Sequence, residues 1–85
     1  MTREINRIQW KCRRGMREID LLLREFSKKH LSDLDEAELS VFDAVLNYDD
    51  QTLYDFIFKN VGLENSLHEK FIETYLKTFT KQGNF

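Results

Sequence analysis

Residues 14–29 read RGMREIDLLLREFSKK, and this stretch decides the fold class. Its apolar residues recur at spacings of three and four, which places their side chains on one face of an α-helix. They are Met16, Ile19, Leu22, Leu23 and Phe26. The lysines that close the stretch suit the negative end of a helix dipole. We therefore predict an amphipathic helix over residues 14–29 that buries this stripe.

Helical spacing continues on both sides of this stretch, and no segment alternates convincingly between apolar and polar residues. A first helix is predicted over residues 3–12. Asp35 and Glu38 form a capping-box pattern at the start of a third helix, and Asp49 is predicted to cap a fourth. The residues of these two helices predicted to face the core are Leu39, Phe42, Val45, Leu46, Leu53, Phe56, Ile57 and Val61.

The last third of the chain carries the signals of a fifth helix. Gly62 is predicted to end the fourth helix in a conformation with positive φ. Ser66 with Glu69 repeats the capping box for a helix over residues 66–81. Its apolar residues are Leu67, Phe71, Ile72, Tyr75, Leu76 and Phe79. Residues 82–85 are predicted to fray.

Length and composition agree with a bundle of such helices. The chain has 85 residues and no proline, so the residue that most strongly breaks helices is absent. This length provides one hydrophobic core and no room for a second. We predict an all-α protein, a compact single-domain bundle of about five helices with short connections that spans residues 1–85.

Several classes of protein are excluded by the same counts. The longest wholly apolar runs, such as residues 21–23, have three residues, whereas a membrane span needs about 20. The N-terminus has no apolar signal core. The single cysteine, Cys12, has no intramolecular partner for a disulfide, which favours a reducing compartment. We expect a cytoplasmic protein without membrane insertion.

Catalytic and metal-binding patterns are missing from the sequence. His30 and His68 are far apart and neither has a Cys or His partner at ligand spacing. Cys12 has basic neighbours that would lower a thiol pKa, but no oriented base accompanies it, and we interpret it as a structural, buried or half-buried residue. Asp49 and Asp50 are sequence neighbours, which do not face each other on a helix. We predict no catalytic residue, no metal site and no enzyme activity.

Charge is divided along the chain. Residues 1–30 hold nine Lys or Arg and four Asp or Glu, whereas residues 31–60 hold one and eight. This division indicates either internal pairing or two surfaces for different partners. Because many of the acids lie in predicted first turns of helices, we interpret the acidic excess as a complement to helix dipoles. The basic excess gathers around Gly15 and is interpreted as a partner-facing end.

Residues 10–20, WKCRRGMREID, are the most informative stretch for function. A helix beginning at Arg13 would align Arg14 with Glu18 on one side, and its simplest interpretation is a solvated, salt-bridged face. Gly15 does not fit that interpretation, because glycine inside a helix costs about 1 kcal/mol relative to alanine. It indicates a bend between two helices or the close approach of another chain. An aromatic residue, Trp10, and several arginines beside a glycine are typical of an interface hot spot.

These residues resemble the signature of a known family. Residues 14–18, RGMRE, match the RGxxE motif of the SdhE family, also called succinate dehydrogenase assembly factor 2. The segment from Leu34 to Glu38 with Phe42, and the run DDQTLYDF at residues 49–56, resemble later parts of the same family. The resemblance covers essentially the whole chain. Phe56 is a departure, since many relatives have Trp there, which puts any contact through an indole N–H in doubt.

The resemblance implies a five-helix assembly factor that promotes covalent attachment of FAD to the flavoprotein subunit of succinate dehydrogenase and, in some bacteria, of fumarate reductase. It implies that Arg14, Gly15 and Glu18 contact the immature flavoprotein. The flanking candidates are Trp10, Arg13, Met16, Arg17 and Asp20. No cofactor is expected to bind stably to the chain itself, because FAD is attached to the client. The free protein is expected to be a monomer, and the short N-terminus resembles that of bacterial members.

Two other functions are compatible with parts of the sequence. The basic first third would suit nucleic acid, although the acidic middle and a pI near 5.6 weigh against nucleic-acid binding. The second alternative is that the chain binds FAD itself and acts as an enzyme or carrier. The absence of a dinucleotide-binding fingerprint from the sequence weighs against it.

Overall fold

The computed structural model describes the backbone of residues 2–81 and the side chains of residues 5–80; the predicted fraying of residues 82–85 lies outside this range. All regular structure within the described range is helical, which confirms the predicted all-α class. The elements are α1 (Thr2–Lys11), α2 (Arg17–His30), the 3-10 turn η1 (Leu31–Asp33), α3 (Glu36–Val45), α4 (Asp50–Lys59), α5 (Ser66–Phe71), the π-helical segment η2 (Ile72–Lys77) and α6 (Thr78–Lys81). The last three follow one another without a break, so the described chain forms five helical stretches.

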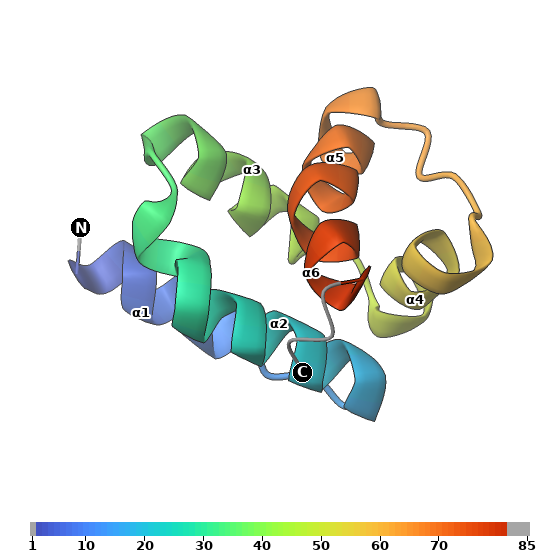
Figure 1. Ribbon diagram of the computed structural model, residues 1–85. Helices are drawn as coiled ribbons and strands as arrows, with labels where there is room; N and C mark the ends of the chain where they lie inside the picture. Colours follow the sequence, from blue (N-terminus) through green and yellow to red (C-terminus); the bar gives the residue numbers. More distant parts are fainter. Residues whose placement is uncertain (1, 82–85) are drawn as a thin grey trace.

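The helices pack around one core, with α1 and α2 on one side and the other helices on the other (Figure 1). α1 and α2 run antiparallel to each other, and residues of both line one hollow. The α5–η2–α6 stretch packs against α2 and lies between α3 and α4. Phe26 of α2 lies at the centre, with its ring centroid 5.5 Å from that of Phe42 and 5.9 Å from that of Phe79 in edge-to-face geometry. The predicted stripe of α2 is confirmed as core, because Ile19, Leu22 and Leu23 are fully buried.

Two of the predicted core positions are wrong. Val61 is 53% exposed, because α4 ends at Lys59 and the chain turns away before reaching it. Leu67 is 60% exposed in the first turn of α5, at the edge of a hollow between α3 and α5. Phe56 is buried as predicted, and the Lys77 ammonium lies 4.4 Å from its ring centroid. The phenyl ring at this position therefore serves packing.

The helix caps confirm some predictions and correct others. Asp35 accepts a hydrogen bond from the Glu38 N–H at 2.8 Å, and the Glu38 carboxylate accepts one from the Asp35 N–H at 3.0 Å, which is the predicted capping box. Asp49 caps α4 as predicted, because it accepts from the Thr52 N–H at 2.8 Å. Each cap satisfies amides that the first helical turn leaves unpaired.

Around the connection between α4 and α5 the predicted caps are displaced. The left-handed residue that ends α4 is Asn60, with φ 59°, whereas the φ of Gly62 lies outside that region. Asn65, and not Ser66, caps α5 by accepting from the His68 N–H at 3.1 Å. Glu69 does not close a capping box there, because its carboxylate accepts from the N–H of Leu63 at 2.7 Å. The short polar side chain of asparagine tolerates the left-handed conformation at Asn60 and accepts the capping hydrogen bond at Asn65.

The largest correction concerns the start of α2. The predicted helix begins at residue 14, but α2 begins at Arg17, and residues 12–16 form a loop that we call the α1–α2 loop. The predicted alignment of Arg14 with Glu18 along one helix is therefore wrong. The alternative that Gly15 marks a bend between the first two helices is correct.

No helix in the described part of the chain is long and apolar enough to cross a membrane.

Candidate functional site

The α1–α2 loop is held in place by the side chain of Arg14. Its guanidinium donates to Asp50 Oδ1 at 2.7 Å, to the carbonyl oxygen of Leu46 at 2.9 Å and to that of Lys11 at 3.1 Å. A further hydrogen bond reaches the carbonyl oxygen of Tyr48. Only 12% of this side chain is exposed. Arg14 thus clamps the loop onto the segment that joins α3 to α4.

Asp50 is the second anchor of the loop. Its Oδ1 pairs with Arg14, and its Oδ2 accepts a hydrogen bond from the Met16 N–H at 3.1 Å. Partial burial works against the ionised carboxylate, but the hydrogen bonds from Arg14, Met16 and Gly15 outweigh it and lower the pKa of Asp50. The carboxylate at the first position of α4 therefore fixes the loop while it also complements the helix dipole.

Asp20 and Tyr48 complete the support. Asp20 Oδ1 accepts from the Arg14 N–H at 2.8 Å, which turns the chain into α2. Tyr48 provides a carbonyl oxygen to Arg14, and its hydroxyl lies 2.7 Å from Nδ1 of His68 on α5. The loop is consequently held to α2 through Asp20 and to α4 through Asp50, while Tyr48 links the segment between α3 and α4 to α5. Such pre-organisation lowers the entropic cost of presenting the loop to a partner.

The eight predicted site residues all lie at this junction of α1 and α2, but they divide into two groups. Arg14, Met16 and Asp20 are half-buried and face the protein. The five others are exposed: Trp10, Arg13, Gly15, Arg17 and Glu18. Trp10 is 69% exposed, and the Arg13 guanidinium lies 5.3 Å from its ring centroid. The exposed five form what we call the junction surface.

Gly15 has no structural reason to be glycine. Its φ lies outside the left-handed region, and a Cβ built on it would lie 3.8 Å from Asp50 Oδ2, an ordinary van der Waals contact. The fold would therefore accept a side chain at this exposed position. Arg17 is also unfavourably placed for the fold, because it occupies the first position of α2, where the helix dipole disfavours a cation.

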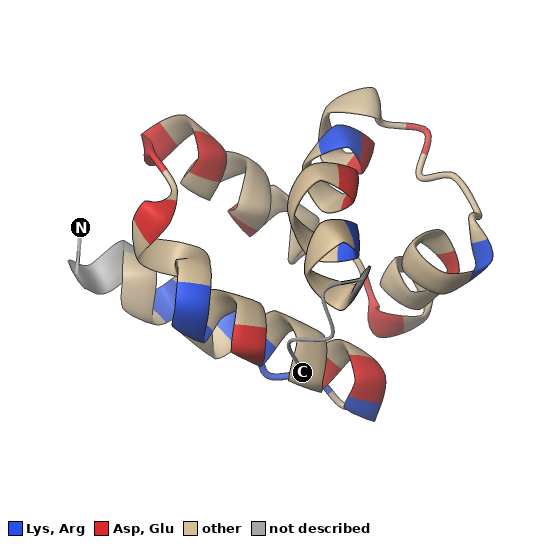
Figure 2. Cartoon of the chain, viewed as in Figure 1, with Lys and Arg blue, Asp and Glu red and all other residues tan. Residues whose placement is uncertain are grey.

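Part of the charge division serves internal pairing, one of the two alternatives that the sequence left open. Asp43 of α3 pairs with Lys11 at 2.7 Å and with Arg7 at 2.9 Å. Burial opposes the ionised Asp43, but these two hydrogen bonds outweigh it and lower its pKa. Together with the Arg14–Asp50 pair, these contacts join α1 and the α1–α2 loop to α3 and α4. Figure 2 shows where basic and acidic residues lie along the helices.

Cys12 is an internal residue, as expected. Its side chain is 1% exposed, and burial raises its pKa to about 11 even though Ser27 and nearby cations act in the opposite direction. A thiol with this pKa is protonated at neutral pH and is a poor nucleophile. Within the described residues, no three His, Cys, Asp or Glu side chains come together in a way that would hold a metal ion.

Asp50 is the residue of this site that sequence reasoning missed. Capping of α4 explains its neighbour Asp49, and the family resemblance of the run DDQTLYDF at residues 49–56 is the sequence signal that points to Asp50. The backbone carbonyls of Leu46 and Tyr48 carry no sequence signal at all, because any residue provides the same acceptor.

The described part of the chain is a small helical protein in which a loop held by polar contacts lies beside an exposed aromatic residue, a glycine and charged side chains, a composition typical of interface hot spots. Comparison with known proteins gives the family. The family described as "Flavinator of succinate dehydrogenase" matches residues 6–79, and the chain belongs to it.

Curated relatives agree with this assignment. The "FAD assembly factor SdhE" of Legionella pneumophila (strain Paris) is 42% identical over 67 residues, which cover 79% of this chain and 85% of the relative. The protein of the same name from Coxiella burnetii (strain RSA 493 / Nine Mile phase I) is 39% identical over 66 residues, 78% of this chain and 80% of the relative. The protein of the same name from Vibrio vulnificus (strain YJ016) is 33% identical over 72 residues, which cover 85% of this chain and 84% of the relative. No solved structure matches the chain.

Proposed function

We propose that this chain is an assembly factor that promotes covalent attachment of FAD to the flavoprotein subunit of succinate dehydrogenase. The description of its family as a flavinator of succinate dehydrogenase and the name of its relatives, FAD assembly factor, support this proposal. The observation in the structure that carries the proposal is Gly15, an exposed glycine in a rigidly held loop where the fold does not require glycine. A partner whose backbone approaches closely gives that glycine a reason.

The site residues divide the work. Gly15 lets the client backbone approach, and Glu18 and Arg17 form charge-assisted hydrogen bonds with it. Trp10 and Arg13 supply a stacked aromatic and cationic contact beside them. Arg14 acts as a positioning residue, because its donors are directed to Asp50 and to backbone carbonyls of this chain. Met16 and Asp20 likewise support the loop from within.

The chemistry of attachment belongs to the client. Forming the bond requires a client side chain held against the flavin, with the charge that develops on the ring system stabilised. The assembly factor needs only to bind more tightly to the client conformation in which these groups meet, and so to shift the population towards it. It carries no catalytic residue of its own and holds FAD only through the client.

The same surface serves fumarate reductase where a bacterium has a homologous flavoprotein subunit, as the sequence resemblance implies. We further propose that the free protein is a cytoplasmic monomer that binds neither nucleic acid nor membrane. The pairing of its basic hairpin with Asp43 and Asp50 leaves less of the positive charge available to nucleic acid.

Co-expression tests this proposal. The flavoprotein subunit of succinate dehydrogenase is produced with and without this chain in a host that lacks its own assembly factor, and covalent flavin is read as fluorescence on a denaturing gel. We expect strong fluorescence and co-purification of the two proteins only with the chain present. Equal covalent flavin in its absence would contradict the proposal, and so would tight FAD binding by the isolated chain without a client.

A further inference from the structure

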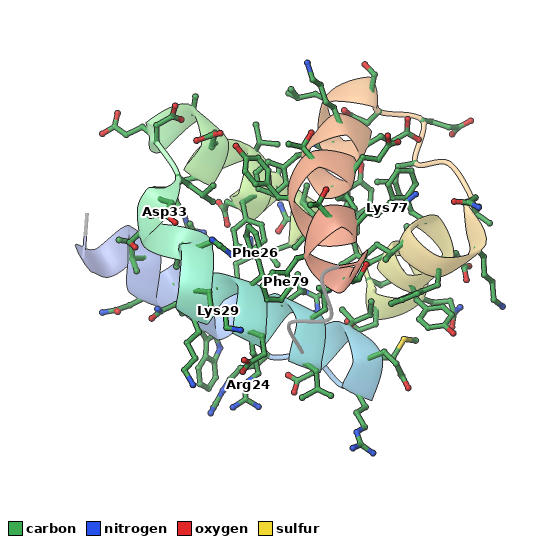
Figure 3. All side chains as sticks on the ribbon, in the orientation of Figure 1. Arg24, Phe26, Lys29, Asp33, Lys77 and Phe79 are labelled. Carbon is green, nitrogen blue, oxygen red and sulfur yellow. The ribbon has the colours of Figure 1, made fainter. Side chains whose placement is uncertain are left out.

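A shallow hollow of about 270 Å³ lies between α1 and α2, beside the junction surface. Its lining residues are Gln9, Cys12, Arg13, Arg24, Ser27 and Lys28. All three charged residues among them are cations: Arg13 comes from the α1–α2 loop, and Arg24 and Lys28 come from α2. Figure 3 shows Arg24 projecting from α2 on the side opposite to the core rings of Phe26 and Phe79.

The positive charge around this hollow is only partly neutralised. Asp20 pairs with Arg24 at 3.3 Å, but its other oxygen is occupied by the Arg14 N–H at 2.8 Å. No acidic side chain of the described part of the chain forms an ion pair with Arg13 or Lys28. Cations gathered in this way repel one another, and an anion placed among them relieves the repulsion.

The floor of the hollow is suited to an anion because it adds no negative charge. Cys12 and Ser27 form it, at 1% and 6% exposure. The thiol stays protonated at neutral pH, since burial raises its pKa to about 11. The serine hydroxyl is neutral at any ordinary pH. Floor and rim are therefore complementary to a negatively charged group.

The hollow is continuous with the junction surface through Arg13, which lines the hollow and lies over the exposed ring of Trp10. It is also open and shallow, with donors on the rim. A small free anion binds best where donors enclose it, whereas carboxylates carried on a protein surface are held by the rest of the interface. The open, shallow shape of the hollow therefore favours binding of side chains of a docked protein over binding of a free ion.

We propose that the hollow between α1 and α2 receives carboxylate side chains of the client, and that Arg13, Arg24 and Lys28 form an electrostatic extension of the docking surface. The inference rests on the proposed function, because it takes the client of that function as the partner. It assigns to the client an acidic group next to the segment that contacts Gly15. Its main effect is on the rate of association, which complementary charge accelerates.

The test compares two double variants of equal net charge. Arg24→Gln with Lys28→Gln removes two cations from the hollow, and Lys59→Gln with Lys70→Gln removes two exposed cations from α4 and α5. Association of each with the purified flavoprotein subunit is measured by biolayer interferometry from low to physiological ionic strength. We expect the hollow variant to associate about tenfold more slowly at low salt, with a flatter salt dependence, and the control to stay within about twofold of wild type.

The outcomes separate this inference from the proposed function. Equal slowing of both variants would show that only net charge matters and would overturn the inference. A hollow variant that associates with the flavoprotein subunit as fast as the wild type at low salt would likewise overturn it. A wild-type chain that does not bind the flavoprotein subunit at all would instead overturn the proposed function, and the inference with it.

Discussion

Arg14 illustrates how one residue determines a surface without being on it. Its guanidinium is bonded to one carboxylate and to backbone carbonyls from two other segments of the chain. A cation of this kind stabilises when paired, and removing its partner leaves an uncompensated charge in a partly buried place. The conformation of the α1–α2 loop, and with it the position of Gly15, therefore depends on Asp50.

Asp50→Asn tests this dependence. We expect it to lower the free energy of unfolding by about 2 kcal/mol at pH 7, because it removes the charge partner of Arg14. Urea unfolding measures the loss, with Glu73→Gln on the exposed side of η2 as the control. A loss equal to that of the control would show that the pair does not hold the loop.

The pH dependence of the same variant has a definite sign. The folded-state pKa of Asp50 is lowered, so its stabilising effect is complete above the unfolded value near 3.9 and is lost as pH falls through the folded pKa. The difference between wild type and Asp50→Asn should be constant from neutral pH to about pH 5 and should shrink below about pH 4. A difference that grew on acidification would contradict this assignment.

At the scale of the element, local signals were sufficient where one side chain and one backbone amide make the structure. The capping box of Asp35 and Glu38 and the cap at Asp49 were predictable for that reason. The start of α2 was not, because apolar spacing places Met16 on the helical stripe while Asp50, 34 residues away, holds its N–H outside the helix. The prediction for Gly62 is wrong because asparagine, too, can adopt the left-handed conformation, and it is Asn60 that does so here.

Asp35→Ala tests the energetic weight of the cap on α3. The substitution leaves the Glu38 N–H without its acceptor, and we expect a loss of about 1 kcal/mol in the free energy of unfolding. Ser40→Ala, at an exposed position inside the same helix, should change stability by less than about 0.5 kcal/mol. Chemical denaturation of the wild type, Asp35→Ala and Ser40→Ala measures these free energies of unfolding. Equal stability of all three would mean that packing alone sets the start of α3.

At the scale of the whole molecule, the sequence was enough to predict the fold class, whereas the orientation of the candidate site residues needed the structure. Apolar spacing revealed the stripe of α2, and Gly15 marked the junction. That Arg14 faces inward while Arg17 faces outward could not be read from a line of residues, because it depends on Asp50 and on carbonyls of Leu46 and Tyr48.

The central claim is that an exposed glycine in a pre-organised loop receives the client. The most direct test of this claim measures covalent flavin on the flavoprotein subunit co-expressed with the Gly15→Arg variant. Ser40→Arg is the control, because it adds the same charge at an exposed position of α3. Circular dichroism should show both variants folded, since a side chain at residue 15 meets no close contact within the chain. We predict that Gly15→Arg abolishes covalent flavin fluorescence of the co-expressed flavoprotein subunit on a denaturing gel, while Ser40→Arg preserves it. Normal fluorescence with folded Gly15→Arg would contradict the account.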